Sequence, residues 1–88
     1  TSGYNDQKSK HLKIYPNPFR HAIRVGTKAN ESQPANITIT DLHGNDVYQK
    51  VLTSEDTLIN LDFLSDGVYI VGLEDENGLS VFEKLCKR

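Results

Sequence analysis

Three histidines, His11, His21 and His43, are the first residues of this 88-residue chain that could supply acid–base or metal chemistry. They lie far apart in the sequence, without the short paired spacing that zinc-binding histidines use. His21 falls on the apolar face of a predicted strand, where a histidine with a hydrogen-bond partner is more common than a metal ligand. The histidine pattern therefore predicts neither a catalytic site nor a metal site.

Twelve Asp and Glu residues invite a calcium-binding or glycosidase interpretation. The segment 62–67 begins like a calcium loop, with acids at its first and fifth positions and glycine at its sixth. However, Leu64 and Leu73 occupy the third and twelfth positions, where such a loop needs oxygen ligands. Catalysis by paired carboxylates needs a cleft, and so small a domain has little room for one. We interpret the segment as a turn and predict no metal and no cofactor.

Cys86 is the single cysteine, and it lies among Lys84, Lys87 and Arg88. Neighbouring cations favour the reactive thiolate, but no histidine is nearby in sequence to act as a base. One cysteine can form neither an intrachain disulfide nor a multi-cysteine zinc site. The nucleophile motif Gly-x-Ser-x-Gly and the P-loop are also missing from the sequence. The sequence predicts no catalytic residue, and hence no enzyme.

The net charge is −2, but the charges are unevenly distributed. Residues 1–28 hold six Lys or Arg against one acid, residues 29–83 hold one Lys against eleven acids, and residues 84–88 hold three cations. A nucleic-acid-binding domain is usually basic throughout, so this pattern argues against nucleic acid as a partner. No apolar run approaches the roughly 18 residues of a transmembrane helix, so no membrane-spanning segment is predicted.

The elements that must position these residues are short strands. Apolar residues alternate with polar ones in seven segments, separated by turn-rich stretches such as 41–46 and 75–78. The segments are 12–15, 19–25, 37–40, 47–52, 59–63, 68–73 and 79–86. This pattern predicts an all-β fold, an Ig-like seven-stranded antiparallel β-sandwich, over residues 12–88. Residues 1–11 show no apolar periodicity and are predicted to be a linker or mobile arm.

Period-two alternation also predicts which side chains form the core. Tyr69 follows a turn at Gly67, the setting of a tyrosine corner, so its hydroxyl should be bonded to backbone and Gly67 should adopt a conformation costly for other residues. The predicted core consists of Ile23, Val25, Ile37, Ile39, Leu61, Tyr69, Val71 and Val81.

Four short motifs stand out, and three of them (the two prolines, the 64–69 segment and the basic tail) are not explained by a generic sandwich. The two prolines of the first motif fix two φ angles and predict a rigid bend at a sheet edge or between sheets. The motifs are Tyr15-Pro16-Asn17-Pro18, the turn Asp41-x-x-Gly44 after a strand, Leu64-x-x-Gly67-x-Tyr69, and Lys84-Leu85-x-Lys87 before a final Arg88. In this order, over residues 12–88, they resemble the type A C-terminal sorting domain of proteins exported by the type IX secretion system of Bacteroidetes. Cys86 departs from the family pattern, which more often has an apolar β-branched residue there.

The resemblance implies a function as an address label. Such domains follow a cargo domain and direct it from the periplasm, through the outer-membrane translocon and its shuttle proteins, to the cell surface or the medium. A sortase-like protease usually removes the domain and anchors the cargo. The resemblance implies that Lys84, Leu85, Lys87 and Arg88 form the recognition signal.

The charge of the terminal residues suits such a signal. Three cations at an exposed chain end can be attracted to an acidic receptor groove, and the last strand can offer its edge to a partner. We therefore expect Lys84, Lys87 and Arg88 to be exposed and to contribute little to folding. The alternative is a tail that clamps within the molecule onto the acidic residues of 29–83. The polar arm, residues 1–11, offers a stretch for cleavage.

Two other functions remain open. One is an Ig-like interaction module that is retained uncleaved on a cell-surface or secretion-machinery protein. The other is a carbohydrate-binding β-sandwich, which needs an exposed aromatic platform. The sequence has no Trp and only four Tyr, which is too few aromatic side chains to favour the carbohydrate-binding alternative.

Overall fold

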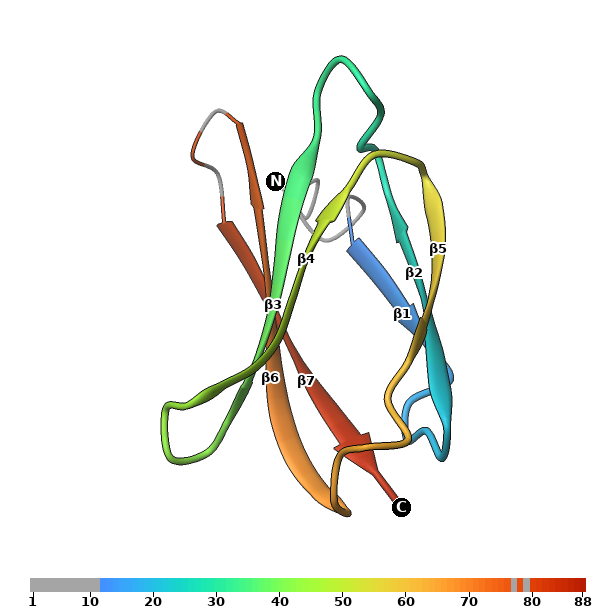
Figure 1. The fold of residues 1–88 in the computed structure, drawn as a ribbon, viewed down its shortest axis with the longest axis vertical. Helices are drawn as coiled ribbons and strands as arrows, with labels where there is room; N and C mark the ends of the chain where they lie inside the picture. The colour runs from blue at the N-terminus through green and yellow to red at the C-terminus, as the bar shows by residue number, and fades with distance from the viewer. Residues whose placement is uncertain (1–11, 77, 79) are drawn as a thin grey trace, which may run out of the picture.

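The computed structural model describes residues 12–76, 78 and 80–88, and these residues form two antiparallel sheets packed face to face (Figure 1). One sheet has the strand order β1-β2-β5 and the other β4-β3-β6-β7. Within the described residues there are seven strands and no helix, which confirms the predicted all-β sandwich. The strands are β1 (Leu12–Tyr15), β2 (Ala22–Thr27), β3 (Ala35–Asp41), β4 (Asp46–Leu52), β5 (Asp56–Asn60), β6 (Gly67–Asp75) and β7 (Ser80–Lys87).

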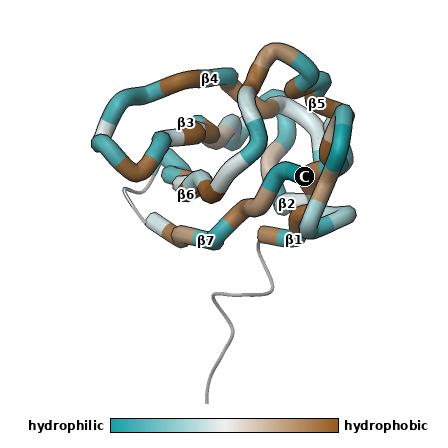
Figure 2. Tube along the Cα trace, turned by 90° about the horizontal axis from the view of Figure 1, so that it is seen from below, coloured by the Kyte–Doolittle hydropathy of each residue, from teal (hydrophilic) through white to brown (hydrophobic). Residues whose placement is uncertain are grey.

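Alternating side chains explain why these segments are strands. In β3, Ala35, Ile37 and Ile39 are buried, whereas the residues between them are exposed or half-buried. Strand β6 repeats the pattern and pairs with β3 on one side and β7 on the other, so the most apolar strand is central, as predicted. Seen end-on in Figure 2, the two sheets form two layers.

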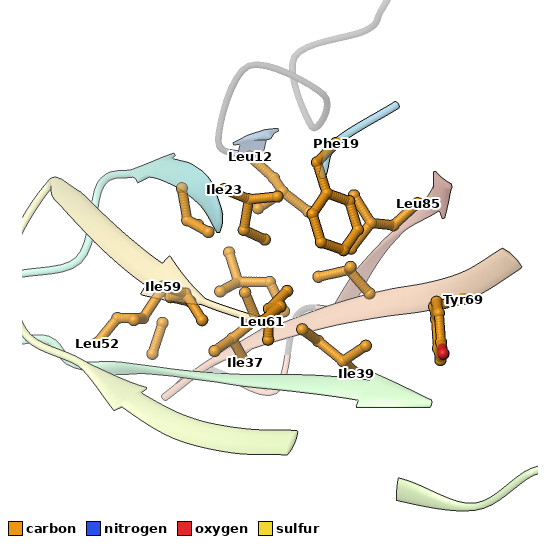
Figure 3. Packing of buried hydrophobic residues seen from close by; sticks show 14 of the residues in the cluster. Leu12, Phe19, Ile23, Ile37, Ile39, Leu52, Ile59, Leu61, Tyr69 and Leu85 are labelled. Carbon is orange, nitrogen blue, oxygen red and sulfur yellow. The ribbon is translucent and has the colours of Figure 1, made fainter. Parts of the chain in front are cut away.

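The core lies between these layers, and each strand contributes the apolar side chains of one of its faces to it. All the predicted core residues are buried except Val81, which is partly buried and packs against the cluster. The core also contains Phe19 and Leu85, from the first connection and the last strand (Figure 3). The core thus joins the two chain segments that hold the most distinctive motifs.

Two predicted strand boundaries are wrong, because the chain bends before β2 and turns after β5. The segment 19–25 becomes a strand only from Ala22, and His21 is exposed, with its Nδ1 atom 2.7 Å from Asp62 Oδ1. Strand β5 ends at Asn60, where the Leu64 amide bonds the Leu61 carbonyl in a turn. That turn buries Leu64 and leaves Phe63 exposed.

Candidate recognition site

The Pro-Asn-Pro motif carries the chain from the three-stranded sheet to the free edge of the four-stranded sheet. The bonds Tyr15–Pro16 and Asn17–Pro18 are both cis. After this bend the Asn17 side chain faces the terminal strand: its Nδ2 donates to the Lys84 carbonyl at 2.8 Å, and its Oδ1 accepts from the Cys86 amide at 3.1 Å. The side-chain amide of Asn17 therefore pairs with β7 as a neighbouring strand would.

Phe19 continues this pairing through its backbone. Its amide donates to the Cys86 carbonyl, and its carbonyl accepts from the Arg88 amide, both at 2.9 Å. Its ring is buried in the core. Residues 17–19 thus occupy the outer edge of β7 from Lys84 onward. The sequence suggested that this edge could bind a partner strand, but this half of it is already covered.

Lys87 is buried, contrary to the expectation that all three terminal cations are exposed. Its Nζ atom donates to the carbonyls of Leu61 at 3.0 Å, Asp62 at 3.1 Å, and Leu64. These carbonyls belong to the turn between β5 and β6, where no strand supplies donors, and buried carbonyls need partners. The tail is therefore clamped onto backbone oxygens.

The other predicted signal residues divide between the core and the surface. Leu85 is fully buried, whereas Lys84 and Arg88 are exposed and Cys86 is half-buried. Lys84 and Arg88 are consequently the cations of this motif that a partner can reach, while Leu85 and Lys87 hold the strand in place.

The Leu64–Tyr69 motif has the predicted geometry. The Tyr69 hydroxyl donates to the Ser65 carbonyl at 2.6 Å and the residue is buried, as in a tyrosine corner. Gly67 has φ of 154°, a value that L residues rarely adopt. Tyr69 lies opposite Leu85 in the β6–β7 register. The motif therefore supports the same end of β7 that residues 17–19 cover.

The turn that begins at Asp41 is held by its own carboxylate. The Oδ1 atom accepts from the amides of His43 at 2.8 Å and Asn45 at 3.0 Å. The Asn45 backbone hydrogen bond is the main cause that lowers the pKa of Asp41 below its ordinary value. Gly44 closes the turn with φ of 88°.

All four motifs meet at one end of the sandwich, the lower end in Figure 1, where the C-terminus also lies. Asp41 is opposite Tyr69, and Tyr69 is opposite Leu85. Sequence reasoning missed Phe19 and the carbonyls of Leu61 and Asp62. The prolines signalled a bend, but no local pattern indicated what the bend would contact.

Over residues 12–76, 78 and 80–88, no group of three His, Cys, Asp or Glu side chains is arranged to hold a metal ion. A search of the same ranges for a helix long and apolar enough to span a membrane finds none.

The fold and the clamped terminal strand define an Ig-like β-sandwich whose family motifs gather around its C-terminus. Residues 13–88 match the family model described as the secretion system C-terminal sorting domain, and the chain belongs to this family.

A solved structure shares the fold: PorZ, an essential bacterial surface component of the type-IX secretion system of Porphyromonas gingivalis, with a TM-score of 0.70 and 21% identity. The alignment covers 94% of this chain but 12% of the PorZ chain, so the chain spans a small part of that protein's length. No curated protein gave a significant match.

Proposed function

We propose that this domain is the export address of a cargo protein that precedes it and that passes through the type IX outer-membrane translocon. The observation that carries the proposal is the meeting of all four family motifs at one end of a sandwich whose sequence matches the sorting-domain family. The cargo crosses the periplasm and reaches the outer-membrane surface or the medium. The domain acts as substrate and label, with no catalytic role.

The recognition surface that we propose is the basic end around Lys84 and Arg88, joined by the exposed Arg20 beside Phe19. Leu85 and Lys87 position this surface, because their side chains are committed to the core and the β5–β6 turn. A receptor that took the tail as an extended peptide would first have to break those contacts. The translocon or its shuttle proteins therefore bind the tail in its folded form, through an acidic surface of their own.

The route after recognition is part of the same proposal. Residues 1–11, outside the described residues, act as the linker in which a sortase-like protease separates the cargo from the domain formed by residues 12–88. The polar composition of this stretch supports the assignment.

The test fuses the chain to a reporter in a host that has this secretion system. The double variant Lys84→Ala/Arg88→Ala should fold normally yet leave the reporter in the periplasm, because only exposed charges are removed. The matched control is Lys13→Ala/Lys50→Ala, which removes two exposed cations from other strands. Normal export of the first variant, or equal retention of both, would contradict the proposed surface.

The second candidate is a module retained on a surface protein. It is favoured by the likeness to a segment of PorZ, an essential bacterial surface component of the type-IX secretion system. Mass spectrometry of the surface-exposed product separates the two functions. A sorting domain is missing from the mature cargo, whereas a retained module is still attached to it.

A further inference from the structure

We propose that the groove between the β3–β4 turn and the β5–β6 loop binds an extended segment of a partner protein, with an apolar side chain beside a Lys or Arg. This surface is separate from the cations at the tail, and the inference does not depend on the export route. The groove is lined by Leu42, Val47, Phe63, Leu64, Asp66 and Tyr69, among others.

Two of the large exposed apolar side chains of the described residues lie together in this groove. Leu42 is 68% exposed and Phe63 is 62% exposed, and both line the same groove. Leu64 and Tyr69 form a buried floor, and the Phe63 ring is steadied by Tyr48, with ring centroids 6.2 Å apart. Two large apolar side chains therefore face solvent over a firm apolar base, an arrangement typical of a protein-binding site.

The other large exposed apolar side chains are not grouped in this way. Tyr15 and Leu58 lie on either side of Arg24 in register across the three-stranded sheet. Val51 and Phe82 lie on β4 and β7, with two strands between them. The groove is thus the place where exposed apolar surface is concentrated among the described residues.

The charge of the groove selects a cationic partner. Its lining includes the carboxylates of Asp41 and Asp66 and no Lys or Arg. The Oδ1 atom of Asp41 accepts from two turn amides, and its Oδ2 atom lies 3.5 Å from the Asn45 side-chain amide. Asp66 has no hydrogen-bond or ion-pair partner among the described residues. Lys87 is bonded behind the groove to the Leu64 carbonyl and offsets part of the charge, but it is buried. Asp66 is therefore the group that would pair with an incoming cation.

The charge and shape together define the partner segment. Its apolar side chain contacts Leu42, Val47 and Phe63, while the adjacent cation reaches Asp66. A charge-assisted contact gives direction and the apolar contact gives most of the affinity. The open, shallow form of the site fits a peptide segment better than an enclosed small molecule.

Binding can be measured on the full 88-residue chain with fluorescein-labelled octapeptides of Gly and Ser that carry a central Leu or Phe. The flanking residues are two Lys, two Gln or two Glu. Fluorescence anisotropy should show Lys-flanked peptides binding at least about tenfold more tightly than Glu-flanked ones. Amide shifts in NMR spectra should fall in residues 41–47 and 63–69.

Variants of exposed residues complete the test. Leu42→Ser and Phe63→Ser should weaken binding by about tenfold, and Asp66→Asn should reduce the preference for Lys over Glu. Leu58→Ser is the matched control, since Leu58 is 61% exposed on the opposite sheet, and it should change nothing. No binding by any peptide, binding that ignores Phe63→Ser, or preference for Glu flanks would overturn the inference.

Discussion

The two halves of the terminal strand β7 pair in the same way with β6 but differ on their outer edge. From Lys84 to Lys87, the strand is paired with β6 on one side and covered by residues 17–19 on the other, and Lys87 is clamped to the β5–β6 turn. From Ser80 to Glu83, the strand pairs with β6, and the described residues place no neighbour on its outer edge. One strand therefore contains a structural anchor and an open edge.

This difference separates residues of the same type. Lys84 and Lys87 belong to one short motif, yet Lys84 is exposed and Lys87 donates to three carbonyls. A motif shared by a family is thus not uniformly a contact surface. Leu85 and Lys87 hold the strand in place, whereas Lys84 is exposed, and substitutions can distinguish these two positions.

The largest contrast should come from Leu85 and Phe82. Leu85→Ala removes a fully buried side chain and should reduce the free energy of unfolding by about 4 kcal/mol. Phe82 is 68% exposed and its ring lies over Gly72 on the next strand, so Phe82→Ala should cost only about 0.5–1 kcal/mol. Urea unfolding measures both. Similar losses of unfolding free energy in the two variants would mean that both halves of β7 contribute equally to stability.

The next contrast is between the two lysines. Lys87→Met keeps the aliphatic stem but leaves three carbonyls without their charged donor, which should cost about 3 kcal/mol. Lys84→Met should stay within about 0.5 kcal/mol because Lys84 is exposed. Thermal unfolding of the two variants compares them directly. A stable Lys87→Met variant would show that the clamp does not stabilise the fold.

A substitution of Asn17 tests whether residues 17–19 protect the outer edge of β7. Asn17→Ala removes two hydrogen bonds, to the Lys84 carbonyl and the Cys86 amide, and should cost about 2 kcal/mol. Hydrogen exchange at the Cys86 amide should accelerate. Asn36→Ala, at an exposed position on β3, is the control and should alter neither quantity. Unchanged exchange at Cys86 would indicate that Phe19 alone protects the edge.

Tyr69 gives a smaller effect. Tyr69→Phe retains the ring but loses the bond to the Ser65 carbonyl, so it should cost about 1 kcal/mol. Tyr48→Phe, at a half-buried ring, serves as control, and chemical denaturation compares the two. A larger loss in the control would contradict the tyrosine-corner role.

The smallest expected effect is the change in stability at acid pH that comes from Asp41. Because the fold lowers the pKa of Asp41 from its ordinary 3.8, the ionised carboxylate stabilises the fold above that value, and the stability is lost as pH falls through the lowered pKa. Asp41→Asn should therefore be less stable than the wild type at neutral pH, and the gap should narrow below about pH 4. Urea midpoints across pH measure the gap. A gap that widens with acid would contradict this sign.

The sequence alone determined the all-β class, the central place of β6 and the tyrosine corner, because alternation and turn chemistry are local. A period of two decides which side chains of a strand share a face, and the Ser65–Tyr69 bond spans only four residues. The family motifs also predicted a recognition signal at Lys84, Leu85, Lys87 and Arg88, and its role in recognition stays a prediction.

The tertiary structure alone decided which motif residues are anchors. Asn17 meets Lys84 and Cys86 across 67 and 69 residues, and Lys87 meets the β5–β6 turn across 23 to 26 residues. Local patterns could not place Lys87 inside, because a terminal lysine is normally solvated. It is buried because the carbonyls of Leu61, Asp62 and Leu64 receive no donor from a neighbouring strand, and they converge on Lys87 only when the two sheets have closed.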